Sequence, residues 1–134
     1  MGAITSGVHH IGLTVKDLSR SKEFFIDTLG FKQTGEIADY PAVFLSDDSI
    51  MLTLWQVENP DQAAPFNYTN NIGLHHVAFK LDSDKALDEL HQKLLQIDDV
   101  TFEFGPEPVG EGPTRHMICF EPGGVRIEFI APQG

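Results

Sequence analysis

The sequence predicts an α+β domain that contains two copies of one module, each with the order strand, helix, strand, strand, strand. First, VHHIGLTVKDL at residues 8–18 aligns without a gap on LHHVAFKLDSD at residues 74–84, at a constant offset of 66 residues. Second, apolar and polar residues alternate in both segments, which is typical of strands. Third, each segment precedes a helical pattern and three further strand-like runs.

Both helical patterns show start and stop signals. In the first, Ser19 is the expected N-cap and Gly30 the expected end, with an apolar face formed by Phe24, Phe25 and Leu29. In the second, Ser83 is the expected N-cap, and leucine and isoleucine recur at spacings of three and four residues, at Leu87, Leu90, Leu94 and Ile97.

The remaining strands are expected to be short and joined by tight turns. They are predicted at Phe31–Glu36, Ala42–Ser46, Ser49–Val57, Val100–Phe104, Arg115–Phe120 and Val125–Ala131. Residues 105–114, rich in Gly and Pro, are predicted to be irregular. We therefore expect one domain over residues 1–134, with a first module at about 7–57, a linker at 58–72 and a second module at about 73–131.

Composition excludes several classes of protein. Hydrophobic residues make up 41% and charged residues 22% of the 134 residues, which is typical of a globular domain. The formal net charge is −11 and the nine Lys and Arg residues are scattered, so neither nucleic acid nor a membrane surface is an expected partner. No secretory signal or membrane span is evident, and the single cysteine, Cys119, indicates the cytoplasm. Cys119 is interpreted as a small buried hydrophobe, with a catalytic thiol as the alternative.

Strand parity places two histidines on matching faces. If Leu13 and its apolar neighbours pack under the helix, His10 faces the opposite, concave side of the sheet, and His76 does the same in the second copy. The small residues Gly12 and Ala78 beside them leave room for a bulky group. By the same parity, His9 and His75 face the helix and are interpreted as structural histidines.

A carboxylate in the last predicted strand faces the same side. Glu128 lies between Ile127 and Phe129, and a buried carboxylate needs a cation or hydrogen-bond donors. An ion pair with an arginine is one solution. The repeat favours another interpretation, in which His10, His76 and Glu128 bind one divalent metal. Two imidazoles and one carboxylate would leave coordination positions open for a substrate. Met51 is taken as the counterpart of Glu128 in the first module.

The sequence resembles the vicinal oxygen chelate superfamily, which includes glyoxalase I, fosfomycin- and bleomycin-resistance proteins and extradiol dioxygenases. The segments that carry this resemblance are HHIGLTVKDLSRSKEFFIDTLGF at residues 9–31, LHHVAFKL at 74–81 and FEPGGVRIEF at 120–129. It implies two βαβββ modules curled into an incomplete barrel around one metal ion, with His10, His76 and Glu128 as ligands. Glyoxalase I-like members have a fourth ligand, a glutamate, where Met51 is expected here, so the resemblance implies a three-ligand site.

The resemblance also implies an activity. We expect a divalent-metal-dependent enzyme, using Fe, Mn, Zn or Ni, that chelates neighbouring oxygens of a small substrate in a lyase, isomerase or dioxygenase reaction. His116 is the candidate general acid–base, with a rim histidine as the alternative. The candidate substrate contacts are Met51, Trp55 and Arg126. The alternative function is a metal-independent module that binds an antibiotic or metabolite, as in bleomycin resistance. Relatives of this size imply a homodimer.

Overall fold

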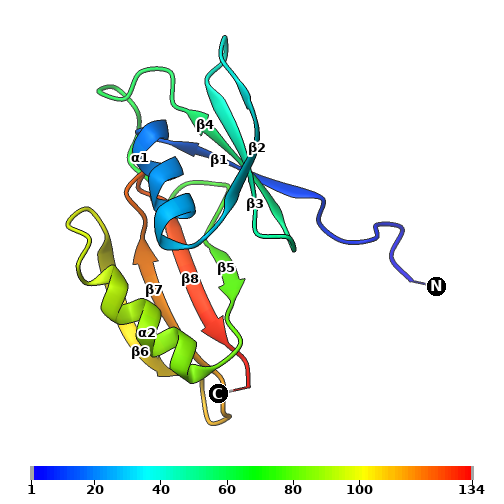
Figure 1. The fold of residues 1–134 in the computed structure, drawn as a ribbon, viewed down its shortest axis with the longest axis vertical. Coiled ribbons are helices and arrows are strands. Elements are labelled where there is room, and N and C mark those ends of the chain that lie inside the picture. The colour runs from blue at the N-terminus through cyan, green and yellow to red at the C-terminus, as the bar shows by residue number, and fades with distance from the viewer. Residues whose placement is uncertain (1, 134) are drawn as a thin grey trace. The chain divides into compact units, whose positions relative to one another are not determined.

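The computed structural model describes residues 2–133 and contains two compact units, residues 1–63 and 64–134. The boundary falls inside the segment predicted as a linker. Each unit has the element order strand, helix, strand, strand, strand, as the sequence repeat predicts (Figure 1). The predicted α+β class with two βαβββ modules is therefore confirmed.

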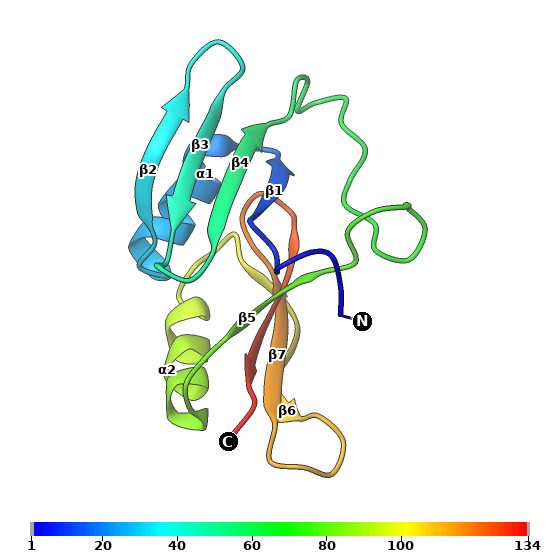
Figure 2. The same ribbon diagram turned by 90° about the vertical axis from the view of Figure 1, so that its right-hand side faces the viewer.

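The first unit is a four-stranded sheet with one helix. Its strands lie in the order β1-β4-β3-β2, with β1 parallel to β4 and the other pairs antiparallel (Figure 2). Helix α1 contacts β3 and β4. The elements are β1 (His10–Val15), α1 (Leu18–Glu23), a π-helical turn η1 (Phe24–Thr28), β2 (Lys32–Ile37), β3 (Ala42–Ser46) and β4 (Met51–Gln56).

The second unit repeats this topology. Its strand order is β5-β8-β7-β6, again with the first and last strands parallel. Helix α2 lies along one face of this sheet and contacts β6 and β8 (Figures 1 and 2). The elements are β5 (Val77–Lys80), α2 (Asp84–Leu94), β6 (Thr101–Pro108), β7 (Arg115–Phe120) and β8 (Arg126–Ala131).

Alternation along the strands determines which face is buried. In β1, Leu13 and Val15 are buried whereas His10 and Thr14 are exposed, as parity predicts. The apolar side of each sheet forms the core of its unit together with the helix, and burial of this apolar area is the main stabilising contribution. The core residues include Phe24, Phe25, Leu45, Leu52 and Leu54 in the first unit, and Leu87, Leu94, Met117, Ile127 and Phe129 in the second.

The first helix differs from its prediction in its N-cap and in the geometry of its second half. Its N-cap is Asp17 and not the predicted Ser19. The Asp17 carboxylate accepts a hydrogen bond from the Arg20 backbone N–H at 3.1 Å. After Glu23 the helix widens into a π-helical turn. This turn allows the adjacent side chains Phe24 and Phe25 both to be fully buried. The helical region ends as predicted at Gly30, whose φ of +82° favours glycine.

The irregular segment predicted at residues 105–114 is shorter in the structure. Strand β6 continues to Pro108, where Glu107 and Pro108 pair with β7, so only the segment after them is a loop. The register shifts between Phe102 and Phe104 and again between Phe104 and Glu107, which indicates bulges. Because β6 is the edge strand, Pro106 and Pro108 can be accommodated in it.

The predicted N-cap of α2 is confirmed and can be tested by substitution. The Ser83 hydroxyl accepts a hydrogen bond from the Ala86 backbone N–H at 3.1 Å. We expect Ser83→Ala to lower the free energy of unfolding by about 1 kcal/mol, measured by urea denaturation, because one helix N–H loses its partner. Ser83→Asp should retain most of the stability, and Ser6→Ala, at an exposed position outside the helices, should have no effect. Equal stability of Ser83→Ala and the wild type would contradict this role.

Candidate metal centre

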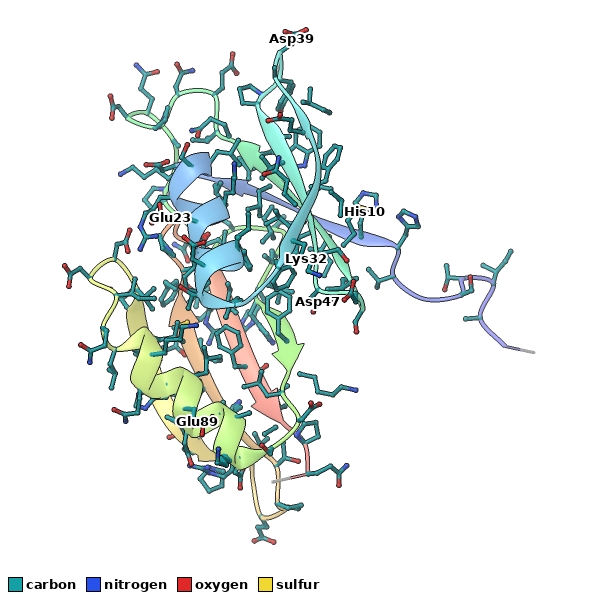
Figure 3. The ribbon with its side chains drawn as sticks, viewed as in Figure 1. His10, Glu23, Lys32, Asp39, Asp47 and Glu89 are labelled. Carbon is teal, nitrogen blue, oxygen red and sulfur yellow. The ribbon has the colours of Figure 1, made fainter. Side chains whose placement is uncertain are left out.

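His10 is the proposed ligand that the first unit supplies. It begins β1, is exposed, and lies away from α1 (Figure 3). Its neighbour His9 precedes the strand and is also exposed, with the two Nδ1 atoms 2.9 Å apart. The prediction that His9 packs on the helix face is therefore wrong, because alternation applies only inside the strand.

The open face of the first sheet is lined by Thr53, Trp55 and Met51. The Trp55 indole N–H donates to the Thr53 hydroxyl at 2.8 Å, and the Tyr40 ring meets the Trp55 ring edge to face at 5.1 Å. A Cβ on Gly12 would lie 3.0 Å from the Thr53 hydroxyl oxygen. The room expected beside His10 is thus occupied by side chains of the same sheet.

The strand register corrects the expected counterpart of Glu128. Glu128 pairs with Ala78, and the repeat equates Ala78 with Gly12, whose partner in β4 is Thr53. Thr53, and not Met51, therefore occupies the position of Glu128 in the first unit. Neither Met51 nor Thr53 carries a carboxylate. The expectation of a three-ligand site therefore stays a prediction with either residue at this position. Met51 pairs with His10 and is the counterpart of Arg126.

In the second unit, the structure brings three of the predicted site residues together. His76 lies immediately before β5, and its Nε2 is 3.2 Å from Glu128 Oε1. The other carboxylate oxygen of Glu128 is 2.5 Å from His116 Nδ1. The Glu128 side chain is 12% exposed, and its neighbours are histidines rather than the arginine of the alternative interpretation. The His116 ring also packs against Phe104, with ring centroids 4.9 Å apart.

Arg126, a predicted substrate contact, is buried in a polar cluster. Its Nε and Nη2 donate to the two oxygens of Glu103 at 3.2 and 2.7 Å, and its guanidinium lies 3.9 Å from the centre of the Tyr68 ring. The Tyr68 hydroxyl donates to Glu103 at 2.9 Å. The Arg126 guanidinium holds the pKa of Glu103 below its ordinary value, and donation to Glu103 raises the pKa of Tyr68.

The same guanidinium also contacts His75. Arg126 Nη1 lies 3.2 Å from His75 Nδ1, which in turn lies 2.7 Å from His76 Nδ1. His75 is exposed and precedes β5, so the prediction that it faces the helix is wrong for the same reason as for His9. Sequence reasoning missed Tyr68 and Glu103. Glu103 could have been considered as a partner for Arg126, whereas Tyr68 lies in the linker, where no periodic pattern applies.

The ligand set suits a divalent metal in its chemistry. An imidazole nitrogen and a carboxylate oxygen of the second unit converge at His76 and Glu128, and both are ordinary ligands of Fe, Mn, Zn and Ni. The third proposed ligand, His10, belongs to the first unit. Among residues 2–133, no group of three or more His, Cys, Asp or Glu side chains is already arranged to hold a metal ion.

Known proteins resemble this chain in both sequence and fold. The family model for the Glyoxalase/Bleomycin resistance protein/Dioxygenase superfamily matches residues 7–129. The uncharacterized protein YqjT of Bacillus subtilis is 26% identical over 93% of this chain and 98% of its own length. Metapyrocatechase of Geobacillus stearothermophilus is 27% identical over 93% of this chain, which corresponds to 37% of that protein.

A solved structure shows the same fold. A glutamate-to-glutamine mutant of the fosfomycin resistance protein FosX from Listeria monocytogenes, in complex with Mn(II) and 1S,2S-dihydroxypropylphosphonic acid, superimposes with a TM-score of 0.77. The match covers 96% of this chain and 94% of that chain at 19% identity. Within the described part of this chain, no helix is long and apolar enough to cross a membrane.

Cys119 is the remaining candidate for chemistry, and its environment predicts an inert thiol. It is fully buried in β7, where desolvation, with a smaller contribution from Glu121, raises its pKa from 9.0 to about 12. The thiol therefore stays protonated at neutral pH, and a protonated thiol is a poor nucleophile. We expect a thiol-reactive disulfide reagent to label the native protein far more slowly than the protein unfolded in guanidinium. Equal rates in the two states would contradict the buried assignment.

Proposed function

Because this chain belongs to the Glyoxalase/Bleomycin resistance protein/Dioxygenase superfamily, we propose that it is a divalent-metal-dependent enzyme that chelates two neighbouring oxygens of a small substrate. The proposed ligands are His10, His76 and Glu128. The observation that carries the proposal is the 3.2 Å approach of His76 Nε2 to Glu128 Oε1 on a partly buried strand position. The complex of FosX with Mn(II), in a protein of the same fold, supports a metal such as Fe, Mn, Zn or Ni.

Each side chain has a proposed part in the chemistry. A bound divalent ion would supply a Lewis acid that stabilises negative charge on substrate oxygens. Glu128 is kept in one orientation by His116, which contacts its second oxygen at 2.5 Å. Since that contact engages Nδ1 of His116, Nε2 is the nitrogen that remains to exchange a proton with the substrate. Met51 and Trp55, on the open face of the first sheet, are proposed to contact the substrate.

The reaction that we propose is a lyase, isomerase or dioxygenase reaction at neighbouring oxygens. The dioxygenases that the family's description includes support the dioxygenase possibility, for which iron would be the expected metal. We also propose that the protein acts in the cytoplasm, because its single cysteine, Cys119, cannot form an intrachain disulfide.

A metal-independent binding module is the second candidate function. The half-buried ring of Trp55 contacts Tyr40 at 5.1 Å and Phe44 at 6.4 Å between ring centroids. Such an aromatic cluster is suited to bind a flat apolar ligand without metal. Metal-free protein that binds its ligand as tightly as metal-loaded protein would favour this function over the enzyme.

Removal of a proposed ligand tests the metal site directly. We expect the wild-type protein, purified without a chelating tag, to contain metal near one ion per chain by elemental analysis, and to lose activity on treatment with a chelator. His76→Ala and Glu128→Gln should each lower the metal content to background because two ligands cannot hold the ion. His91→Ala, which alters an imidazole on α2 that packs against Phe102, is the matched control. Unchanged metal content in His76→Ala would refute the proposed site.

We propose a homodimer, and complementation tests whether the ligands come from one chain or two. If His10 of one chain and His76 with Glu128 of its partner share a site, mixing His10→Ala with His76→Ala subunits should create one intact site per heterodimer. Metal content and activity should then return to about half the wild-type value in those heterodimers. If all three ligands come from one chain, the mixture should remain metal-free. A monomer in solution that retains metal would exclude the exchanged arrangement.

A further inference from the structure

We propose that Tyr68, in the segment predicted only as a linker, is a positioning residue for the proposed ligand His76. Its ring is fixed to the second sheet and forms the surface on which the His75 ring packs, directly beside His76. This role deepens the proposed metal site, and its effect on metal binding rests on that proposed function. In this role Tyr68 touches neither the metal nor the substrate, and it acts only by holding a ligand in place.

His76 lies outside the strand ladder, so strand pairing alone does not fix its position. Strand β5 begins one residue later, at Val77, which pairs with Ile127. Residues 69–75 are all exposed, and Gly73 has a φ of +142°, a conformation that favours glycine. An exposed stretch of this kind retains backbone freedom unless side chains hold it. The position of His76 therefore depends on contacts made by the residues before it.

The His75 ring connects His76 to Tyr68 by packing. The rings of His75 and His76 meet edge to face with centroids 5.0 Å apart, and the rings of His75 and Tyr68 do the same at 5.2 Å. On its other side, His76 approaches Glu128, with Nε2 3.2 Å from Oε1. Removal of the Tyr68 ring would take away the surface behind His75. The histidine pair could then move away from Glu128, because packed rings keep their places only while their neighbours fill the space around them.

Three side chains of the second sheet hold Tyr68, which is half-buried although its neighbours in the chain are exposed. Its hydroxyl donates to Glu103 Oε1 at 2.9 Å, the Arg126 guanidinium carbon lies 3.9 Å from its ring centre, and the Phe120 ring lies 6.4 Å away between centroids. These residues belong to β6, β8 and β7 respectively. Contacts to the hydroxyl and to the ring restrict the side chain together. Tyr68 is therefore fixed relative to the same sheet that carries Glu128.

The first unit provides an internal comparison. The offset of 66 residues aligns Tyr68 with Gly2, which has no side chain. His10, however, is the first residue of β1 and pairs with Met51, so the strand ladder itself places this proposed ligand. His76 precedes its strand and has no such pairing. The unit whose proposed ligand lies outside the ladder is thus the unit that has the aromatic support.

The first test measures backbone order in the metal-free protein by ¹⁵N relaxation. We expect order parameters of about 0.85 at His75 and His76 in the wild type, and below about 0.6 in Tyr68→Leu. Tyr68→Phe keeps the ring and should keep the order. Phe66→Leu is the matched control, because Phe66 packs on Phe120 in the same segment, with ring centroids 6.4 Å apart. Wild-type order in a folded Tyr68→Leu protein would overturn the proposal. A wild-type order parameter below about 0.6 at His76 would overturn it even if every variant failed to fold.

The second test measures the affinity for Zn(II) by calorimetric titration of the same full-length proteins. We expect Tyr68→Leu to weaken binding roughly 10-fold, as loss of an outer contact that orients a ligand commonly does. Tyr68→Phe and Phe66→Leu should bind nearly as the wild type does. A purely structural role would lower the stability of Tyr68→Leu and leave the affinity of its folded form unchanged, and that result would overturn the proposal. If His76→Ala binds Zn(II) as tightly as the wild type, the proposed metal site fails, while the order parameters still judge the role of Tyr68.

Discussion

The polar interactions in the second unit depend on one constraint, which is that the Glu128 carboxylate lies in an inner strand of a sheet with little access to water. Its side chain is 12% exposed, and β8 has neighbours on both sides. A carboxylate at such a position must receive hydrogen bonds or a cation, since its desolvation is otherwise costly. His116 Nδ1 lies 2.5 Å from one of its oxygens, and His76 Nε2 lies 3.2 Å from the other. The strand order β5-β8-β7 brings both histidines to Glu128, because His76 precedes β5 and His116 lies on β7.

The two repeats show how one backbone can serve two chemical environments. Both units have the same strand order and the same parallel first and last strands. At corresponding register positions, the first unit has Met51 and Thr53 where the second has Arg126 and Glu128. Replacement of two charged side chains by uncharged ones leaves the apolar core pattern intact, because these positions face away from it. The charged cluster can therefore belong to one unit without any difference in fold.

Alternation was sufficient to predict most of the fold and part of the site. A period of two places His10 opposite Leu13 in β1, and places Glu128 opposite Phe129 in β8, because backbone pleating fixes these directions. It could not distinguish Met51 from Thr53 as the counterpart of Glu128, since a shift of two residues preserves the face. Nor could it find Tyr68, whose contacts with Glu103 and Arg126 depend on where a linker lies against the sheet. The π-helical turn at Phe24 was missed because two adjacent buried aromatic residues fit no regular helical period.

The error about His9 and His75 has a structural consequence. Inside a strand, neighbouring side chains point to opposite faces and cannot meet. In each repeat the first histidine lies before the strand, which frees its backbone from alternation and allows both Nδ1 atoms to approach within hydrogen-bonding distance. His9 and His75 can therefore contact the proposed ligands His10 and His76 because they lie before the first residue of a strand. In the second unit the same position brings His75 within reach of Arg126 on β8. His75 therefore contacts both His76, its neighbour in sequence, and the Arg126 guanidinium. The strand register alone does not predict this link between Arg126 and His76.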